Sequence, residues 1–280
     1  MHFRFVALLV AALVLGGCTG QAKQTDDADV DCAKVKCVAL TFDDGPGPYT
    51  DRLLKILQDN DARATFFLIG NKVAANPAGA RRIAEAGMEI GSHTWEHPNM
   101  TTIPPQDVPA QLSRASAAIE SATGHRPTLL RTAGGLVNDD VLAEARRQGL
   151  ADINWDVIPF DWINDANTAA TRYMLMTQIK PNSVVLMHDV YSSTVDLVQQ
   201  FIPVLKANDY HLVTVSQMLG HREPGTSYGS RDNGPPANAL HDIPADQIPS
   251  LPNTPSPAPM PNFPITDIPG ANSGGPNNGV

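Results

Sequence analysis

Positive charge is scarce in this chain. Its 280 residues include 20 Lys and Arg against 29 Asp and Glu, which gives a formal net charge of -9. A protein that binds nucleic acid normally presents a basic patch to the phosphate backbone. The charge balance therefore argues against nucleic acid as a partner and indicates a soluble, acidic protein.

Long hydrophobic runs are missing too, since the apolar stretch at residues 5–15 is too short to cross a bilayer as a permanent anchor. It ends in Leu15-Gly16-Gly17-Cys18, which resembles a bacterial lipobox, whose Cys becomes the lipidated first residue of the mature protein. We therefore expect residues 1–17 to be a lipoprotein signal peptide and Cys18 to be lipidated. The protein would then be exported and held at the membrane of the cell envelope. A plain secretory signal that leaves the protein secreted is the alternative.

Cysteine is scarce, with three in the whole chain. Cys32 and Cys37 lie close together just before the first expected strand. In the oxidising compartment that an exported protein reaches, these two would form a local disulfide. A metal pair is less favoured because no partner cysteines exist elsewhere, and two free thiols are the alternative.

Composition divides the chain into segments. Residues 18–35 are polar and acidic and predict a tether, and residues 36–220 predict one folded domain. After residue 220 the apolar periodicity stops, and 13 of the 24 prolines fall in residues 221–280. We expect this last segment to be a disordered Pro-rich tail. Asp-Ile-Pro occurs in it twice, at 242–244 and 267–269, which is too little to be called a repeat.

Strand-like and helix-like segments alternate through the predicted domain. The expected strands are 36–42, 64–69, 88–91, 128–131, 151–157, 183–187 and 210–215. The expected helices are 50–59, 77–86, 107–122, 138–148, 168–179 and 194–208. This order implies parallel strands with right-handed crossovers. So many units in fewer than 200 residues favour a (β/α) barrel, and an open doubly wound sheet is the alternative.

Two adjacent carboxylates stand where the first expected strand ends, in Thr41-Phe42-Asp43-Asp44-Gly45. In α/β folds ligands are bound at this end of the strands. Two neighbouring Asp side chains repel each other and resist the loss of water, and a metal ion beside them would offset both costs. An Asx-turn that caps the next helix is the alternative for these residues on their own.

A second polar cluster, His93-Thr94-Trp95-Glu96-His97-Pro98, follows the third expected strand. Two His four residues apart share one side of a helical turn and can bind one ion, whereas Glu96 is expected to point away. Asp44, His93 and His97 would supply three protein ligands and leave positions open, as at a catalytic zinc site. The same donors suit Co²⁺ or Ni²⁺, so the metal is expected to be Zn²⁺ with these two as alternatives.

The two clusters together resemble the motifs of the polysaccharide deacetylases with a NodB-homology domain, carbohydrate esterase family 4. TFDDG stands at 41–45 and H-[ST]-x-x-H-P at 93–98, and the resemblance covers residues 36–220. It implies a distorted (β/α) barrel with seven parallel strands. It also implies that Asp43 is the general base, while Asp44, His93 and His97 bind the metal.

The family's remaining motifs are present in weaker form. In Arg131-Thr132-Ala133-Gly134-Gly135 the arginine is kept and the usual aromatic residue is lost. The resemblance implies that Arg131 holds the base ionised and that the N–H of Gly134 binds the oxyanion.

The fourth motif is reduced to Asp161-Trp162, and the fifth is present as Leu186-Met187-His188-Asp189. By resemblance, His188 is the general acid, Asp161 orients it, and Trp162 and Leu186 line the acetyl pocket. On their own, His188 would be a hydrogen-bonded core histidine and Trp162 a core residue.

The implied function is metal-dependent removal of N-acetyl groups from N-acetylglucosamine of a surface polysaccharide, which for an exported and anchored protein is most simply peptidoglycan. Chitin oligomers, another exopolysaccharide and acetylxylan are alternative substrates. A catalytically weak carbohydrate-binding relic and a hydrolase of small amides are alternative functions. The expected partners are an N-acetylated glycan and, through the lipid, the membrane, and a monomer is expected.

Overall fold

The computed structural model describes residues 30–163 and 168–231. The predicted signal peptide, Cys18, most of the tether and residues 232–280 of the predicted tail lie outside the described residues. No helix in the described ranges has the length and apolar character needed to span a bilayer.

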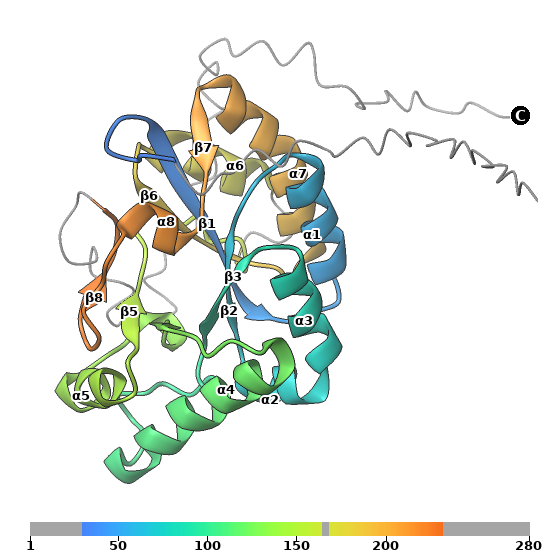
Figure 1. Ribbon diagram of the computed structural model, residues 1–280. Helices are drawn as coiled ribbons and strands as arrows, with labels where there is room; N and C mark the ends of the chain where they lie inside the picture. The colour runs from blue at the N-terminus through green and yellow to red at the C-terminus, as the bar shows by residue number, and fades with distance from the viewer. Residues whose placement is uncertain (1–29, 164–167, 232–280) are drawn as a thin grey trace, which may run out of the picture.

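One parallel sheet organises the described residues (Figure 1). Its strands are β1 Lys36–Gly45, β2 Thr65–Leu68, β3 Glu89–Ser92, β4 Leu129–Leu130, β5 Ala151–Ile153, β6 Ser183–His188, β7 Tyr210–Leu212 and β8 Ser227–Tyr228. The order is β6-β1-β2-β3-β4-β5-β8, and β7 also pairs with β1. All of these pairs are parallel, as the alternation of β and α segments predicts, and β8 is an additional strand next to β5.

The sheet curls until its two ends meet. Just beyond β5, Val157 forms a parallel bridge with Val185 of β6, and the N–H of Leu186 donates to the carbonyl of Val157 at 3.0 Å. This irregular closure makes the fold a distorted barrel. The predicted distorted (β/α) barrel is confirmed, and the open doubly wound sheet is excluded.

Helices cover the outside of the barrel, and Figure 1 shows α1, α3 and α7 stacked along one side of the strands. They are α1 Thr50–Asp59, α2 Gly70–Ala75, α3 Pro77–Glu85, α4 Val108–Thr123, α5 Asp139–Arg147, α6 Thr168–Gln178 and α7 Ser192–Ala207. The short helix α8 Val215–Leu219 instead packs Val215 and Met218 into the hydrophobic cluster inside the barrel. Capping side chains explain where two of the helices begin. Asn76 caps α3 through the N–H of Gly79, and Thr214 and Gln217 form a capping box at α8.

Alternation along β1 sorts its side chains into two layers, because successive residues of a strand point to opposite faces. Val38, Leu40 and Phe42 pack outward in the larger hydrophobic cluster, under the helices. Ala39 belongs to the inner cluster, which also includes Leu186 and Trp155. The same alternation directs Thr41 and Asp43 into the barrel.

The packed region continues past the boundary predicted at residue 220. The N–H groups of Asp152 and Asn154 in and after β5 donate to the carbonyls of Thr226 and Tyr228, at 3.0 and 2.8 Å. Without β8 this edge of β5 would have unpaired backbone groups, which are costly when buried. Residues 221–231 therefore belong to the barrel and not to the tail.

The strand predicted over 210–215 is also corrected. It ends at Leu212, and Val215 begins α8 because Thr214 takes the capping position. Helix α2 was not predicted at all, since its six residues are too short to show a helical period.

A disulfide joins Cys32 to Cys37, with the two Cα atoms 5.5 Å apart. Both residues are buried, and Cys37 is the second residue of β1. The bond ties the start of the described chain to the end of the barrel at which β1 begins, opposite to the end at which Asp43 lies.

Candidate active site

Asp43 and Asp44 lie near the C-terminal end of β1, at a break in the pairing with β2. Asp43 pairs with Phe67 and Gly45 with Leu68, so Asp44 is an extra residue on β1. Its φ of 72° lies in the left-handed region. Such a bulge changes the direction of a side chain and is common beside active sites. Asp44 therefore faces the same rim as Asp43 instead of the helix layer.

The two predicted histidine ligands meet Asp44 at this rim. Asp44 Oδ1 lies 3.5 Å from His93 Nε2 and 3.5 Å from His97 Nε2, and the three donor atoms lie within 4.8 Å of one another. The segment that bears the histidines is not helical, contrary to the helical turn that their spacing suggested. Thr94 and His97 have φ of 63° and 61°, and the N–H of His97 donates to Thr94 Oγ1 at 3.1 Å.

The protonation states suit metal binding. Nδ1 of His93 lies 2.7 Å from the carbonyl oxygen of Arg131, so the ring donates there and Nε2 keeps its lone pair for an ion. Burial lowers the pKa of His93, which favours the neutral form that binds metal. Burial would raise the pKa of Asp44, but the charges of His93, His188 and His97 lower it overall.

An unpaired oxygen supports a cation at this position. Asp44 Oδ1 is buried and has no hydrogen-bond partner among the described residues. Burial of such a group without a partner is costly, and a cation would offset that cost. One carboxylate with two imidazoles is a donor set that fits zinc, and equally cobalt or nickel.

Arg131 holds Asp43 from inside the barrel. Its side chain is fully buried, and Nη1 donates to Asp43 Oδ1 at 2.8 Å and to Thr41 Oγ1 at 2.6 Å. The rest of the guanidinium donates to the carbonyls of Ile153 and Asn154, at 2.7 and 2.9 Å. Because each of its three side-chain nitrogens donates a hydrogen bond, Arg131 is a fixed positive charge against one oxygen of Asp43.

On the other side of the rim, Asp161 holds His188. Asp161 Oδ1 lies 3.0 Å from His188 Nδ1, and Oδ2 accepts from the N–H of His188 and from Thr194 Oγ1, both at 2.8 Å. Burial would lower the pKa of His188, but the hydrogen bond and charge of Asp161, with the charges of Asp43 and Asp44, raise it to about 9. His188 is therefore protonated at neutral pH.

Trp162 and Leu186 lie beside His188. The rings of Trp162 and His188 meet edge to face with centroids 5.2 Å apart. Leu186 is buried two residues earlier on β6, in the inner cluster against which Trp162 packs. Gly134 lies three residues after Arg131, exposed, with φ of 62°. The two residues predicted to line the acetyl pocket, Trp162 and Leu186, thus lie beside His188. Gly134, which is predicted to bind the oxyanion, lies in the segment that follows Arg131.

Asp189 is a rim residue to which the sequence interpretation assigned no role. It is buried, accepts a hydrogen bond from Thr50 Oγ1, and lies so close to Gly45 that a Cβ there would be 3.0 Å from its oxygens. Thr50 in turn accepts from the N–H of Gly47 at 2.8 Å. Burial raises the pKa of Asp189 to about 6. Its position next to His188 at the end of a buried strand was the available signal.

Comparison with known proteins agrees with this geometry. The family model for polysaccharide deacetylase matches residues 31–153. A chitooligosaccharide deacetylase of Bradyrhizobium is 33% identical, over 67% of this chain and 93% of its own length. A solved structure described as T48 deacetylase with substrate superposes with a TM-score of 0.67 at 36% identity, over 71% of this chain and 99% of that one.

Another relative is much longer than this chain, and only part of its length matches. The peptidoglycan-N-acetylmuramic acid deacetylase PdaC of Bacillus subtilis is 37% identical over 65% of this chain, which spans 38% of the length of PdaC. Motifs, barrel and relatives agree, and this chain belongs to the polysaccharide deacetylase family.

Proposed function

We propose that this protein removes N-acetyl groups from amino sugars of peptidoglycan, N-acetylglucosamine first among them, and releases acetate. One observation supports it above the others. Asp43 and His188 flank a single set of metal donors, and each is held by a buried partner of opposite charge. This arrangement separates a base from an acid around one reaction centre.

Asp44, His93 and His97 would hold the metal ion, for which we propose Zn²⁺, with Co²⁺ or Ni²⁺ as alternatives. When bound, the ion would supply Lewis-acid activation of water and of the acetamide carbonyl. Asp44 is the ligand with the unpaired buried oxygen, so a substitution that removes its carboxylate should release the ion.

Asp43 is the proposed general base. Its Oδ1 is occupied by Arg131, whereas Oδ2 is directed to the rim, 3.7 Å from Nε2 of His93. That oxygen is the one left to take a proton from the attacking water. Arg131 orients the carboxylate and keeps a positive charge beside it.

His188 is the proposed general acid. Nδ1 is occupied by Asp161, so the proton on Nε2 is available to the departing amine. An amine leaves poorly unless it is protonated, and the raised pKa of His188 keeps that proton in place at neutral pH. We propose that Trp162 and Leu186 form the acetyl pocket beside it and that the N–H of Gly134 stabilises the oxyanion.

The substrate and the location rest on separate support. PdaC is named as a peptidoglycan deacetylase and the Bradyrhizobium relative as a chitooligosaccharide deacetylase. The lipobox-like sequence at Cys18 would hold this protein at the cell envelope, where peptidoglycan is the glycan at hand. We therefore propose peptidoglycan as the substrate and a monomeric lipoprotein as the enzyme.

The test is acetate release by purified, metal-loaded protein on peptidoglycan and chitin oligomers side by side, with product analysis to separate glucosamine from muramic acid. We expect release from peptidoglycan, abolished by chelation and restored by Zn²⁺. Acetate release from chitin oligomers and not from peptidoglycan would mean that chitin oligomers are the substrate. The second candidate function, a carbohydrate-binding relic, is favoured by the altered third and fourth motifs. It predicts glycan binding with no acetate from any substrate.

A further inference from the structure

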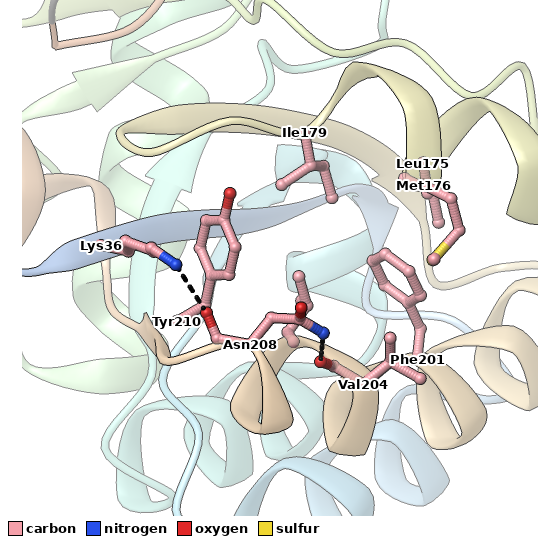
Figure 2. A pocket seen from close by; sticks show the side chains of 9 residues that line it. Lys36, Leu175, Met176, Ile179, Phe201, Val204, Asn208 and Tyr210 are labelled. Carbon is pink, nitrogen blue, oxygen red and sulfur yellow. Dashed lines mark hydrogen bonds between the residues drawn. The ribbon is translucent and has the colours of Figure 1, made fainter. Parts of the chain in front are cut away.

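A pocket of about 210 Å³ lies at the end of the barrel opposite to the candidate active site. We call it the basal pocket, and it is lined by Lys36, Leu175, Met176, Ile179, Phe201, Val204, Leu205, Asn208 and Tyr210. Lys36 begins β1, whereas Asp43 is near its end, so the two sites are separated by most of that strand. Figure 2 shows Lys36 at one end of the pocket and Phe201 with Met176 at the other.

The size and chemistry of the basal pocket suit a short peptide. Clefts that bind drug-sized ligands measure about 300–1,000 Å³, so this pocket has room for one or two side chains. Its wall is aliphatic and aromatic. Among the described residues that line it, Lys36 alone is charged, and its Nζ lies 3.2 Å from the carbonyl of Asn208 and 5.8 Å from the ring centre of Tyr210. No carboxylate of the described residues forms an ion pair with Lys36.

Arg231 is the last described residue, it lies near this pocket, and the chain's own C-terminal segment, residues 232–280, follows it. The N–H of Arg231 donates to the carbonyl of Asn182 at 3.4 Å, and the N–H of Asn182 donates to the carbonyl of Cys37 at 2.7 Å. Cys37 follows Lys36, and Asn182 follows the pocket residue Ile179 by three positions. Arg231, the residue that precedes the C-terminal segment, therefore lies at the same end of the barrel as the pocket.

The sequence of the C-terminal segment complements the pocket. It contains four Asp and no Lys or Arg. Asp-Ile-Pro, at 242–244 and 267–269, combines an acid with an aliphatic side chain and a proline. Asp242 stands 11 residues after Arg231, and a chain of that length can span about 36 Å when extended.

We propose that the Asp-Ile-Pro motifs of the C-terminal segment dock in the basal pocket of the same molecule. The Asp carboxylate pairs with Lys36, the Ile side chain enters the apolar pocket, and the Pro packs on the aromatic ring of Tyr210. Proline-containing segments bind aromatic-lined grooves in this way with little loss of entropy. A short tether gives an effective concentration near the millimolar range, so a weak motif is sufficient, and the two copies compete for one pocket.

The first experiment compares amide NMR spectra of full-length chains. In I243S/I268S, which changes both motifs, we expect the amide signals of Lys36, Ile179 and Tyr210 to move away from their wild-type positions. The matched control is I248S, because Gln247-Ile248-Pro249 has the same apolar pair without the acid. It should leave those signals in place. Unchanged signals in I243S/I268S, or equal changes in I248S, would overturn the proposal.

The second experiment adds the motif from outside. A peptide of residues 239–247 titrated into full-length I243S/I268S should return the three signals toward wild type, and a D242N peptide should do so more weakly. K36Q should lower the affinity for the peptide by about two- to fivefold, which is the range for an exposed ion pair, and added salt should remove that difference. No response to the peptide would overturn the proposal.

Dilution identifies the source of the segment. Docking within one molecule predicts wild-type signals that do not depend on protein concentration. Signals that move with dilution would assign the pocket to the segment of a second copy and overturn docking in the same chain. Acetate release from chitin oligomers should be the same in wild type and I243S/I268S, since the pocket is remote from the rim.

Discussion

Asp43 and Asp44 are neighbours of identical chemistry in different surroundings. Asp43 is 2% exposed and bonded to Arg131, whereas Asp44 is partly open and faces His93 and His97. The bulge at Asp44 separates them, because it places one carboxylate against the buried arginine and the other against the imidazoles. We therefore expect substitutions at the two positions to impair different properties, catalysis at Asp43 and metal binding at Asp44.

The first prediction compares Asp43→Asn with Asp44→Ala. Asp43→Asn keeps the shape of the side chain but cannot accept a proton, so bound metal should stay near wild type. Acetate release should fall by roughly a hundredfold or more, the scale for loss of a general base. Asp44→Ala removes one of three donors, so bound metal should drop sharply. The measurement is metal stoichiometry beside acetate release. Full activity of Asp43→Asn would refute the proposed base.

The second prediction concerns pH. A general acid works in its protonated form, so kcat/KM should fall as pH rises through the pKa of His188, which Asp161 helps to raise to about 9. Asp161→Asn removes the charge that favours the imidazolium, so the descending limb should move to lower pH. Rate profiles of wild type and Asp161→Asn test this, with metal content as the control. Limbs at the same pH would contradict the role of Asp161.

At the scale of elements, β8 supports the site although it lies away from it. β8 holds β5 through the bonds at Asp152 and Asn154, and Ser227 Oγ donates to Asp152 at 2.6 Å. The carbonyls of Ile153 and Asn154 then hold the guanidinium of Arg131. The position of Arg131 thus depends on the last strand of the barrel.

The third prediction follows from this chain of contacts. Truncation after Gly220 removes β8 and, with it, the backbone hydrogen bonds that Asp152 and Asn154 donate to Thr226 and Tyr228. At about 0.5–1.5 kcal/mol for each bond, with lost packing added, Tm should fall by roughly 4 °C or more, and activity should fall with it. Truncation after Arg231 keeps β8 and should leave both nearly unchanged. Differential scanning calorimetry of the two truncated proteins measures this difference in Tm. Equal Tm values would mean that β8 adds no stability.

At the scale of the whole molecule, the chain enters the barrel at the end opposite to its candidate active site. The Cys32–Cys37 disulfide fixes that entry at the start of β1, and Asp43 lies six residues later, about 20 Å away at the rise of a strand. An anchor on Cys18 would hold the entry side toward the membrane. The rim would then face away from the membrane, toward the glycan.

The fourth prediction tests the anchor. Cys18→Ala should abolish lipid labelling and move the protein from the membrane fraction to the soluble fraction. The purified variant should keep its activity on soluble oligomers, because Cys18 has no part in the proposed chemistry. A wild-type protein without lipid label, or a variant that stays in the membrane fraction, would contradict the lipoprotein assignment.

The sequence by itself was sufficient for the parallel β/α units and for the residues of the rim, whereas its pattern favoured a barrel but left an open doubly wound sheet as the alternative. Alternating β and α segments allow few arrangements, and the motifs end strands, so parallel pairing brings them to one edge. The positions of Asp43, Asp44, His93 and His97 follow from this local logic. The disulfide was expected from two close cysteines in a chain that is predicted to be exported.

Only the tertiary structure decided how those residues are presented. The direction of Asp44 depends on a bulge between β1 and β2, and the histidine pair depends on a turn with positive φ in place of a helix. Arg131 is held by carbonyls of a strand more than twenty residues away, and β8 is recruited by the unpaired edge of β5. These features arise from contacts between distant segments, and the short-range patterns of a single sequence do not encode them.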